Sequence, residues 1–245
     1  MKTKKRKVVE LNLGIIVVVI AITVIAITML KYNVEGEKDM PYIIKQMVII
    51  STANGENTQT DENKWNINIY QNNDIYLEIA RNTEYKSNET LKSVRTENIQ
   101  VTSNEKYTTK VYMPDIDSTE MFEYVQANEA TKEINYAIDA TQNIKERKIT
   151  TEGGILALSV CTPELGTYHG NDEKMTYDGT LLNRIGITKE DITANLKFNL
   201  IIETESSKKY KAEINLILPE EDITQTGIQK IEKAKLDNII FKRVN

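Results

Sequence analysis

The chain of 245 residues contains one cysteine, Cys161, and one histidine, His169. A cysteine nucleophile needs a histidine base within hydrogen-bonding reach and a third group, for which Asp172 is the candidate, to orient the ring. One histidine excludes a metal site with two histidine ligands, and one cysteine excludes an intramolecular disulfide. We therefore expect Cys161 and His169 to have structural roles. Cys161 is expected to be a small buried side chain, and His169 to be a loop residue with its hydrogen bonds satisfied.

Three carboxylates that could bind a metal ion lie close together in the sequence, at Asp115, Asp117 and Glu120. Calcium prefers such ligands, but the segment lacks the central glycine and the twelve-residue spacing of an EF-hand, which favours a solvated turn after Pro114. Residues 88–90 (Asn-Glu-Thr) match the glycosylation sequon. The chain contains no G-x-S-x-G, S-x-x-K, H-E-x-x-H or phosphate-binding glycine motif. We therefore expect neither enzymatic activity nor a bound metal or cofactor.

The elements that would position these residues show a period of two, which is typical of strands with one buried face. The stretch WNINIYQNNDIYLEI predicts a hairpin that turns at residues 71–74. Its inward side chains would be those of Trp65, Ile67, Ile69, Ile75, Leu77 and Ile79. An aromatic residue at an inward strand position is usually part of the core, so Trp65 is expected there.

A second hairpin is predicted in NLKFNLIIET and YKAEINLILP, joined by SSKK and ended by Pro219. Its inward residues alternate along both strands: Leu196, Phe198, Leu200, Ile202, Tyr210, Ala212, Ile214, Leu216 and Leu218. This alternation favours an antiparallel pair with one face against a core.

Weaker patterns predict the remaining elements. Strands are expected at 44–52, 93–102, 107–113, 133–140, 154–162 and 237–244, with an Asn-Gly turn at 53–56 after the first. A short helix is expected near 179–187 and a helix start at 188–191. Residues 119–142 fit helical turns as well as strands and are predicted as strand.

The predicted fold class is mainly β, an antiparallel β-sandwich that is plausibly immunoglobulin-like, although the Cys…Trp…Cys framework is absent. One continuous domain over 42–245 is favoured. Two abutting sandwiches divided near 114–119 are the alternative.

An uncharged run, LGIIVVVIAITVIAITML, occupies residues 13–30. Its length suits one crossing of a bilayer core about 30 Å thick. Five of the first seven residues are basic, which keeps the N-terminus in the cytoplasm and places the C-terminal part outside the cell. We expect a cytoplasmic segment at 1–12, a single-pass signal anchor at 13–31 and a tether at 32–41. A cleaved signal peptide is the alternative, but no A-x-A-like site follows the run.

Charge differs between the two sides of this predicted span. The chain holds 31 basic and 36 acidic residues, of which six basic and one acidic lie in residues 1–31. Residues 32–245 therefore hold 25 basic and 35 acidic residues, which gives a formal charge of −10. Binding to nucleic acid or to an anionic membrane surface is driven by basic residues, so neither is expected of this part.

Four stretches, WNINIYQNNDIYLEI, KITTEGGILALSV, NLKFNLIIET and the closing FKRV, resemble uncharacterised signal-anchored proteins of low-GC Gram-positive bacteria. The resemblance spans most of residues 42–245. It implies an exported β-domain held at the cell membrane, and the group has no assigned activity to carry over. The richness in Ile, Lys and Asn agrees with such a source.

We therefore expect a membrane-anchored extracytoplasmic protein that acts through a protein partner, as an accessory, adhesion or envelope structural module. An envelope-directed enzyme is one alternative. A pilin-like filament subunit is another, but Gly14 is followed by IIVVV without the glutamate of the pilin pattern.

Overall fold

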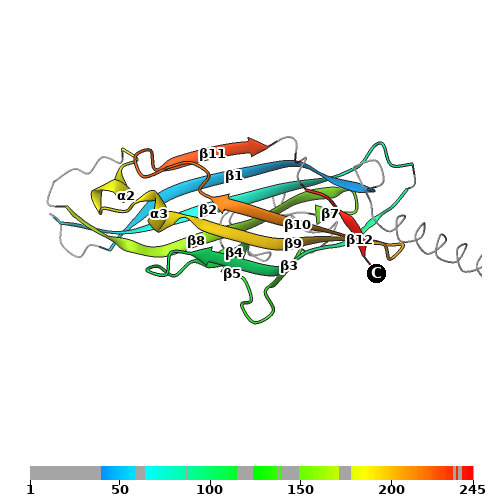
Figure 1. Ribbon diagram of the computed structural model, residues 1–245, viewed down its shortest axis with the longest axis horizontal. Helices are drawn as coiled ribbons and strands as arrows, with labels where there is room; N and C mark the ends of the chain where they lie inside the picture. Colours follow the sequence, from blue (N-terminus) through cyan, green and yellow to red (C-terminus); the bar gives the residue numbers. More distant parts are fainter. Residues whose placement is uncertain are drawn as a thin grey trace, which may run out of the picture.

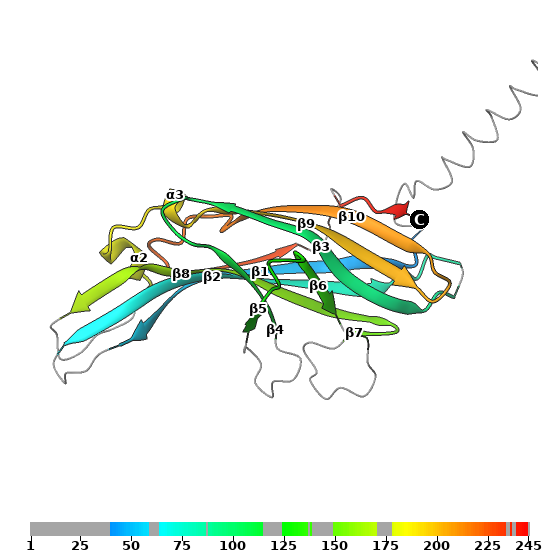
Figure 2. The ribbon, with the colours of Figure 1, turned by 90° about the horizontal axis from the view of Figure 1, so that it is seen from below.

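Two antiparallel β-sheets packed face to face make up most of the described molecule (Figures 1 and 2). The computed structural model describes residues 40–58, 64–86, 88–114, 124–136, 138, 149–170, 178–233, 236 and 239–244. The chain is thus mainly β, as the alternating sequence pattern predicts.

Sheet 1 has the strand order β11-β1-β2-β8-β4-β5, with β7 paired to β8. Its strands are β1 (Tyr42–Asn57), β2 (Trp65–Arg81), β4 (Lys110–Pro114), β5 (Tyr124–Gln126), β7 (Ile149–Thr150), β8 (Gly153–Gly170) and β11 (Ile228–Lys233). Sheet 2 has the order β12-β10-β9-β3-β6. Its strands are β3 (Leu91–Ser103), β6 (Glu133–Tyr136), β9 (Ala194–Thr204), β10 (Lys209–Leu218) and β12 (Lys242–Val244). Each sheet combines strands from both sides of residues 114–119.

The main core fills the space between the two sheets. Sheet 1 contributes Met47, Ile49, Ile75, Leu77, Ile79 and Leu158, and sheet 2 contributes Val94, Leu196, Phe198, Leu200, Ile202 and Ile214. All of them are buried. The predicted hairpin of residues 196–218 is confirmed as β9 and β10, and its nine predicted inward residues all belong to this core.

The predicted hairpin within WNINIYQNNDIYLEI is wrong. Residues 65–81 form one continuous strand, β2, which pairs with β1 on one side and β8 on the other. Gln71 and Asn73 do not turn the chain, because their side chains face inward and find hydrogen-bond partners there. The predicted facing is confirmed: Ile67, Ile69, Ile75, Leu77 and Ile79 are buried, and Trp65 packs partly buried against the apolar cluster at the end of the strand.

The Asn-Gly turn predicted at residues 53–56 is also wrong, since β1 continues to Asn57. Residues 54–56 pair with Ile69 and its neighbours on β2. Other predicted strands differ mainly in length: β8 extends to Gly170, whereas the last strand covers only residues 242–244 of the predicted 237–244. Strand β11, IQKIEK, has no apolar alternation and was not predicted.

Two short helices follow β8, near the predicted positions. These are α2 (Leu181–Arg184) and α3 (Lys189–Ile192). The predicted helix start at Thr188 is confirmed, because the Thr188 N–H donates to the Asp191 carboxylate (3.0 Å) in a capping box. Both helices lie over the ends of β1, β2 and β8 that extend past sheet 2 (Figure 2). There they cover a second, smaller apolar cluster: Ala53, Ile67, Ile69, Leu165, Leu181, Leu182, Ile187, Ile192 and Ile223.

A layer of buried polar side chains, which we call the polar belt, lies between the two apolar clusters on the inner face of sheet 1. It consists of Ser51, Gln71, Asn73 and Thr162, each at most 3% exposed. The Ser51 hydroxyl donates to Asn73 Oδ1 (2.7 Å), Gln71 Nε2 donates to the same atom (2.8 Å), and Thr162 Oγ1 lies 3.0 Å from Thr109 Oγ1. At this level β8 bulges, since Gln71 pairs with Thr162 but Ile69 pairs with Gly166.

No helix in the described part of the chain is both long enough and apolar enough to span a membrane. The predicted anchor at residues 13–31 and nearly all of the predicted tether at 32–41 lie outside the described residues.

Candidate functional site

A pocket of about 350 Å³ opens at the side of the two-sheet body, between β3 of sheet 2 and β4 of sheet 1. The segment 127–132, which leads from β5 to β6, closes one end. Four apolar residues line it: Ile99, Val101, Val111 and Ala127. Its size lies at the lower end of the range of about 300–1,000 Å³ that is typical of ligand sites. We refer to it as the lateral pocket.

Irregular backbone shapes this pocket. The pairing of β3 with β9 shifts register between Glu97 and Gln100, and Asn98 within this bulge has a φ of 54°. Lys132, which lies beside this bulge, has a φ of 48°, and its carbonyl accepts the Ile99 N–H (3.2 Å). Bulges and left-handed residues of this kind concentrate beside binding and active sites. Here the bulge lies where the regular pairing of β3 with β6 ends, at Glu97, and the Ile99–Lys132 hydrogen bond is the next contact between the two segments.

Polar residues surround the apolar lining. They are Gln100, Thr109, Lys110, Asn128, Glu129 and Lys132. Glu129 accepts a hydrogen bond from Gln126 Nε2 (2.7 Å). Lys110 and Lys132 form no ion pair with any described residue. Lys132 and Glu129 belong to this rim, whereas the Lys110 side chain lies on the outer face of sheet 1, since Lys110 pairs with Cys161 there.

Strand β3 leaves a free edge beside the pocket. Strand β6 pairs with β3 only at Val94–Glu97. Residues 100–103 pair with β9 on one side and, within the described part of the chain, with no strand on the other. Such an edge presents unpaired backbone N–H and C=O groups, onto which an extended peptide can add as a further strand.

Cys161 lies on the outer face of sheet 1 and not in the main core. The neighbouring Val160 and Thr162 both point inward and are buried, which places the thiol on the opposite face. Burial and, to a smaller degree, the nearby Asp74 carboxylate raise the pKa of the Cys161 thiol to about 11, although Lys110 counteracts part of the effect. The thiol is therefore protonated at neutral pH, unlike a nucleophilic cysteine. The prediction of a small buried side chain is thus met only in part, because Cys161 is intermediate in exposure and lies outside the main core.

Asp74, on β2, is the other unusual group of this face. Burial raises its pKa, and a hydrogen bond from the Ser159 hydroxyl counteracts part of the effect. Its Oδ1 is buried and has no hydrogen-bond partner. Burial, followed by the proximity of Cys161, also raises the pKa of Tyr70 and Tyr112 on the same face. These groups are thus poorly solvated, and no histidine stands beside the thiol among the described residues.

His169 is not brought to Cys161. Both residues lie on β8, and eight residues of extended strand place them roughly 26 Å apart. The His169 ring instead contacts Asn66 of β2, with 2.7 Å between Nδ1 and Asn66 Oδ1. Asp172, the third member of the hypothetical triad, lies outside the described residues. The geometry of the described residues does not form a cysteine–histidine pair.

The other candidates from the sequence are also separate. Asp115, Asp117 and Glu120 lie outside the described residues, within which no cluster of three metal-ligating side chains occurs. Asn88 of the sequon is exposed. The next residue, Glu89, is buried, and its carboxylate accepts hydrogen bonds from Ser206 and pairs with Lys208.

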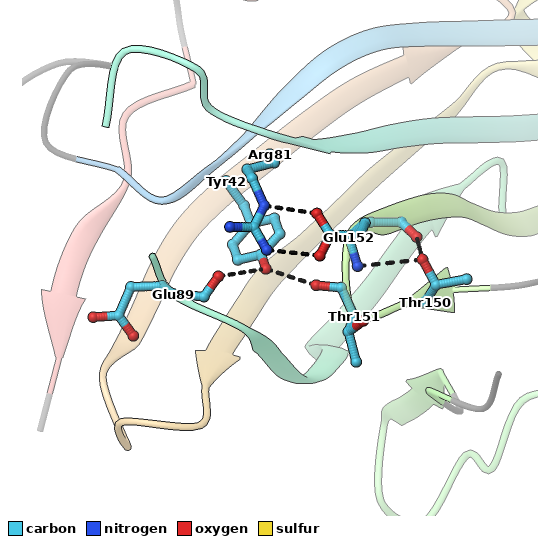
Figure 3. Close-up of polar contacts among 7 residues, drawn as sticks. Tyr42, Arg81, Glu89, Thr150, Thr151 and Glu152 are labelled. Atoms are coloured by element: carbon cyan, nitrogen blue, oxygen red, sulfur yellow. Dashed lines mark hydrogen bonds and ion pairs between the residues drawn. The ribbon is translucent and has the colours of Figure 1, made fainter. Parts of the chain in front are cut away.

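A network of hydrogen bonds and one ion pair, which we call the root network, fixes the end of the molecule where β1 begins (Figure 3). The Tyr42 side chain is fully buried, and its hydroxyl lies 2.7 Å from the Thr151 carbonyl oxygen and 3.0 Å from that of Glu89. Beside it, the Arg81 guanidinium donates two hydrogen bonds of 2.7 Å to the Glu152 carboxylate. The root network thus joins β1, β2, the turn before β8 and the residues that lead into β3.

Comparison with known proteins finds no matching family model, no curated relative and no solved structure that resembles the chain.

The sequence did not reveal the lateral pocket. Its lining residues come from β3, β4 and the segment 127–132, which are distant in the chain, and the bulge that opens it has no glycine or proline to mark it. The one available signal was the break in alternation around Glu97–Gln100, where two polar residues precede Ile99.

Proposed function

We propose that this chain is a membrane-anchored extracytoplasmic protein that acts by contact with another protein, as an accessory, adhesion or envelope structural module. The observation that carries the proposal is the lateral pocket beside the free edge of β3. An apolar pocket next to an unpaired strand edge is a feature of domains that bind peptides by strand addition. The bulge at Glu97–Gln100 and the positive φ of Asn98 lie beside it.

Anchoring at the N-terminus is supported by the apolar run at residues 13–30 and by the basic cluster that precedes it. Two hydrogen bonds next to the root network support it as well. The N–H of Asn82 donates to the Pro41 carbonyl (2.9 Å) and its Nδ2 donates to the Met40 carbonyl (2.8 Å). The chain that would lead from the membrane is thus hydrogen-bonded to β2 as soon as it enters the fold, and a pull on the anchor would be transmitted to sheet 1.

An immunoglobulin-like relationship is part of the proposal and is supported by strand order. The order β1-β2-β8-β4 in sheet 1 corresponds to A-B-E-D, and β10-β9-β3 in sheet 2 corresponds to G-F-C. All of these neighbours are antiparallel. Domains of this architecture commonly act through their loops and edges.

The partner can be sought by proximity labelling in a Gram-positive host. A labelling enzyme is fused to the C-terminus of the full chain, and the control fusion carries residues 1–41 followed by an unrelated β-domain. We expect one envelope or membrane protein to be enriched over the control by both the wild type and His169→Ala. Failure to enrich any protein would contradict the proposal. If the wild type turns over envelope material and His169→Ala or Cys161→Ser does not, the protein is an envelope-directed enzyme and the proposal is wrong.

Topology needs a separate test. Protease added to intact spheroplasts should digest residues 42–245, while a tag at the N-terminus stays protected and sediments with the membrane. A soluble, shortened product in the medium would indicate a cleaved signal peptide instead of an anchor.

A further inference from the structure

We propose that three lysines of sheet 2, Lys209, Lys211 and Lys242, bind the phosphate groups of anionic phospholipids in the bilayer that holds the anchor. We call these residues the lysine cluster, and the end of the molecule fixed by the root network the root end. The contact holds the outer face of sheet 2 against the membrane. The inference rests on the proposed function, because the anchor brings the root end to the bilayer.

The lysine cluster occupies one face of two paired strands. Tyr210 is buried in the main core, so its neighbours on β10, Lys209 and Lys211, point to the outer face of sheet 2. Lys242 of β12 lies directly opposite Lys211, and such cross-strand partners share a face. Like charges in this position repel each other. An anion bound between them relieves this repulsion.

No carboxylate in the described part of the chain forms an ion pair with the lysine cluster. Glu203 lies opposite Lys209 on β9, but its pKa is lowered chiefly by the hydrogen bond from Lys92 (2.7 Å) and only to a smaller degree by Lys209. Further along β10, Glu213 pairs with Lys197 (2.9 Å). The carboxylates on neighbouring positions of this face are thus engaged by other lysines.

A chain of contacts connects the lysine cluster to the first residues of the fold. Tyr210 shares a hydrogen bond with Tyr85, and the Tyr85 N–H donates to the Asn82 carbonyl (3.2 Å). Asn82 Nδ2 donates in turn to the Met40 carbonyl (2.8 Å). Figures 1 and 2 both show β12 at the end where β1 begins. The lysine cluster therefore lies near the point where the tether enters.

The tether is short enough to keep this end at the membrane. The predicted anchor ends at residue 31, and the nine residues from there to Met40 reach at most about 32 Å when fully extended. No other end of the molecule is tied to the anchor in this way within the described part of the chain. The root end is thus the part of the molecule that meets the lipid phosphates most often.

The formal charge of −10 over residues 32–245 disfavours an anionic membrane for the molecule as a whole. The 17 residues of β2 span roughly 56 Å, however, whereas salt screens charges beyond about 8 Å. The charges of the root end therefore decide whether this end is attracted. Among its exposed described acids, Glu84 and Glu205 form no ion pair. The lysine cluster and the exposed Lys86 outnumber them.

An exposed apolar side chain lies beside the lysine cluster. Ile240 is 59% exposed, although the next residue, Phe241, is buried in the main core. Apolar side chains next to basic ones are typical of surfaces that enter the headgroup region of a bilayer. Ile240 therefore favours a lipid surface over a dissolved anion, since only the lipid offers apolar contact.

Acylation of lysines detects the contact residue by residue. The full chain is placed in nanodiscs of phosphatidylcholine, alone or mixed with phosphatidylglycerol, and treated with an uncharged N-hydroxysuccinimide ester. Mass spectrometry gives the rate at each lysine. We expect the lysine cluster to react about three- to fivefold more slowly in the anionic nanodiscs, and the difference to disappear at about 1 M salt. Lys64, an exposed residue next to the opposite end of β2, should react equally in both.

A double variant tests whether the cross-strand pair is responsible. With Lys211→Gln and Lys242→Gln combined, the remaining Lys209 should react equally fast in the two kinds of nanodisc. Lys64→Gln is the control and should leave the slow reaction of Lys209 unchanged. Circular dichroism and thermal melting establish that the variants are folded, and the double variant should melt no lower than the wild type, because it loses a repulsion.

A dissolved anion is the competing source of phosphate. Glycerol phosphate added to the phosphatidylcholine nanodiscs should not slow acylation of the lysine cluster. If it slows the reaction as much as phosphatidylglycerol does, the lysines bind a soluble anion and the proposal is wrong. Equal acylation of the wild type in both kinds of nanodisc, or continued slow reaction of Lys209 in the folded double variant, would also overturn it.

These outcomes leave the proposed function standing if protease digestion of spheroplasts still shows residues 42–245 outside the cell and joined to the anchor. A soluble, shortened product in that experiment would instead remove the anchoring on which the inference rests.

Discussion

Single side chains in the polar belt decide how the inner face of sheet 1 is organised. Asn73 is its centre, because its Oδ1 accepts from Ser51 and from Gln71 while its Nδ2 donates to Gln71 Oε1 (3.2 Å). A buried polar group with all its partners contributes only modestly to stability, but one left without a partner costs about 1–3 kcal/mol. Removal of one residue of the polar belt therefore destabilises the protein, because its buried neighbours lose their hydrogen-bond partners.

Replacement of Asn73 by Ala should lower the free energy of unfolding by about 2–4 kcal/mol, since two buried neighbours, Ser51 and Gln71, lose their shared acceptor. Urea denaturation of the wild type and the variant measures the difference. Asn72→Ala, on the outer face of the same strand, is the control and should change stability by no more than about 0.5 kcal/mol. Equal effects of the two substitutions would contradict the role of the belt.

Asp74 predicts a pH dependence of the opposite sign to that of most paired carboxylates. Burial raises its pKa in the folded state, so the folded protein binds more protons than the unfolded chain between the two pKa values. Stability linked to this group is therefore present below the unfolded pKa of about 3.9 and falls as pH rises through the folded pKa. Replacement by Asn keeps the shape of the side chain and removes the charge, and with it the loss of stability at high pH.

We accordingly expect Asp74→Asn to raise the free energy of unfolding by about 1 kcal/mol at pH 7, and the gain to vanish near pH 3.5. Thermal melting of both proteins across pH 3.5–8 is the measurement. Glu203 is the comparison, because the hydrogen bond from Lys92 chiefly lowers its pKa. Glu203→Gln should lower the free energy of unfolding at pH 7, and this loss should disappear in acid. A melting temperature of Asp74→Asn below that of the wild type at pH 7 would contradict the argument.

At the scale of elements, long strands were predicted more reliably than the positions where they end. The alternation of Leu196–Leu218 identified β9 and β10 and placed nine inward residues correctly, because one face of each strand is buried along its whole length. The same rule placed the inward residues of β2 correctly but divided the strand at Gln71–Asp74, since polar residues there imitate a turn. Only the hydrogen bonds across β1, β2 and β8 make these residues compatible with burial, and such contacts cannot be read from local sequence.

The root network supports a further prediction about elements, because it contains a buried contact and an exposed one. Tyr42→Phe keeps the ring and removes only the hydroxyl, which leaves the Thr151 carbonyl without its donor and should cost about 1–2 kcal/mol. Arg81→Ala breaks a partly exposed ion pair with Glu152 and should cost less, about 0.2–1 kcal/mol. Urea denaturation ranks the two. The reverse order would mean that the ion pair, and not the phenol, holds β1 to the turn before β8.

At the scale of the whole molecule, the described residues form two apolar clusters of unequal size that the polar belt separates. Within the described part of the chain, the main core lies between both sheets, whereas the smaller cluster is covered by α2, α3, Tyr107 and Ile223. Sheet 2 does not extend over this end (Figure 2). Local stability follows the amount of buried apolar surface, so the two ends of β2 should open at different free energies although they belong to one strand.

Hydrogen exchange monitored residue by residue should show this gradient along β2. We expect the amides of Ile75–Ile79 to exchange only by global unfolding, and those of Ile67–Ile69 to exchange by a local opening of lower free energy that releases α2 and α3. Leu77→Ala, in the main core, should lower the global free energy of unfolding by about 2–5 kcal/mol. Ile69→Ala, in the smaller cluster, should accelerate exchange at the α2 end while exchange at residues 75–79 changes far less. If both substitutions accelerate exchange equally at both ends of β2, the belt does not divide the molecule and the two clusters unfold as one.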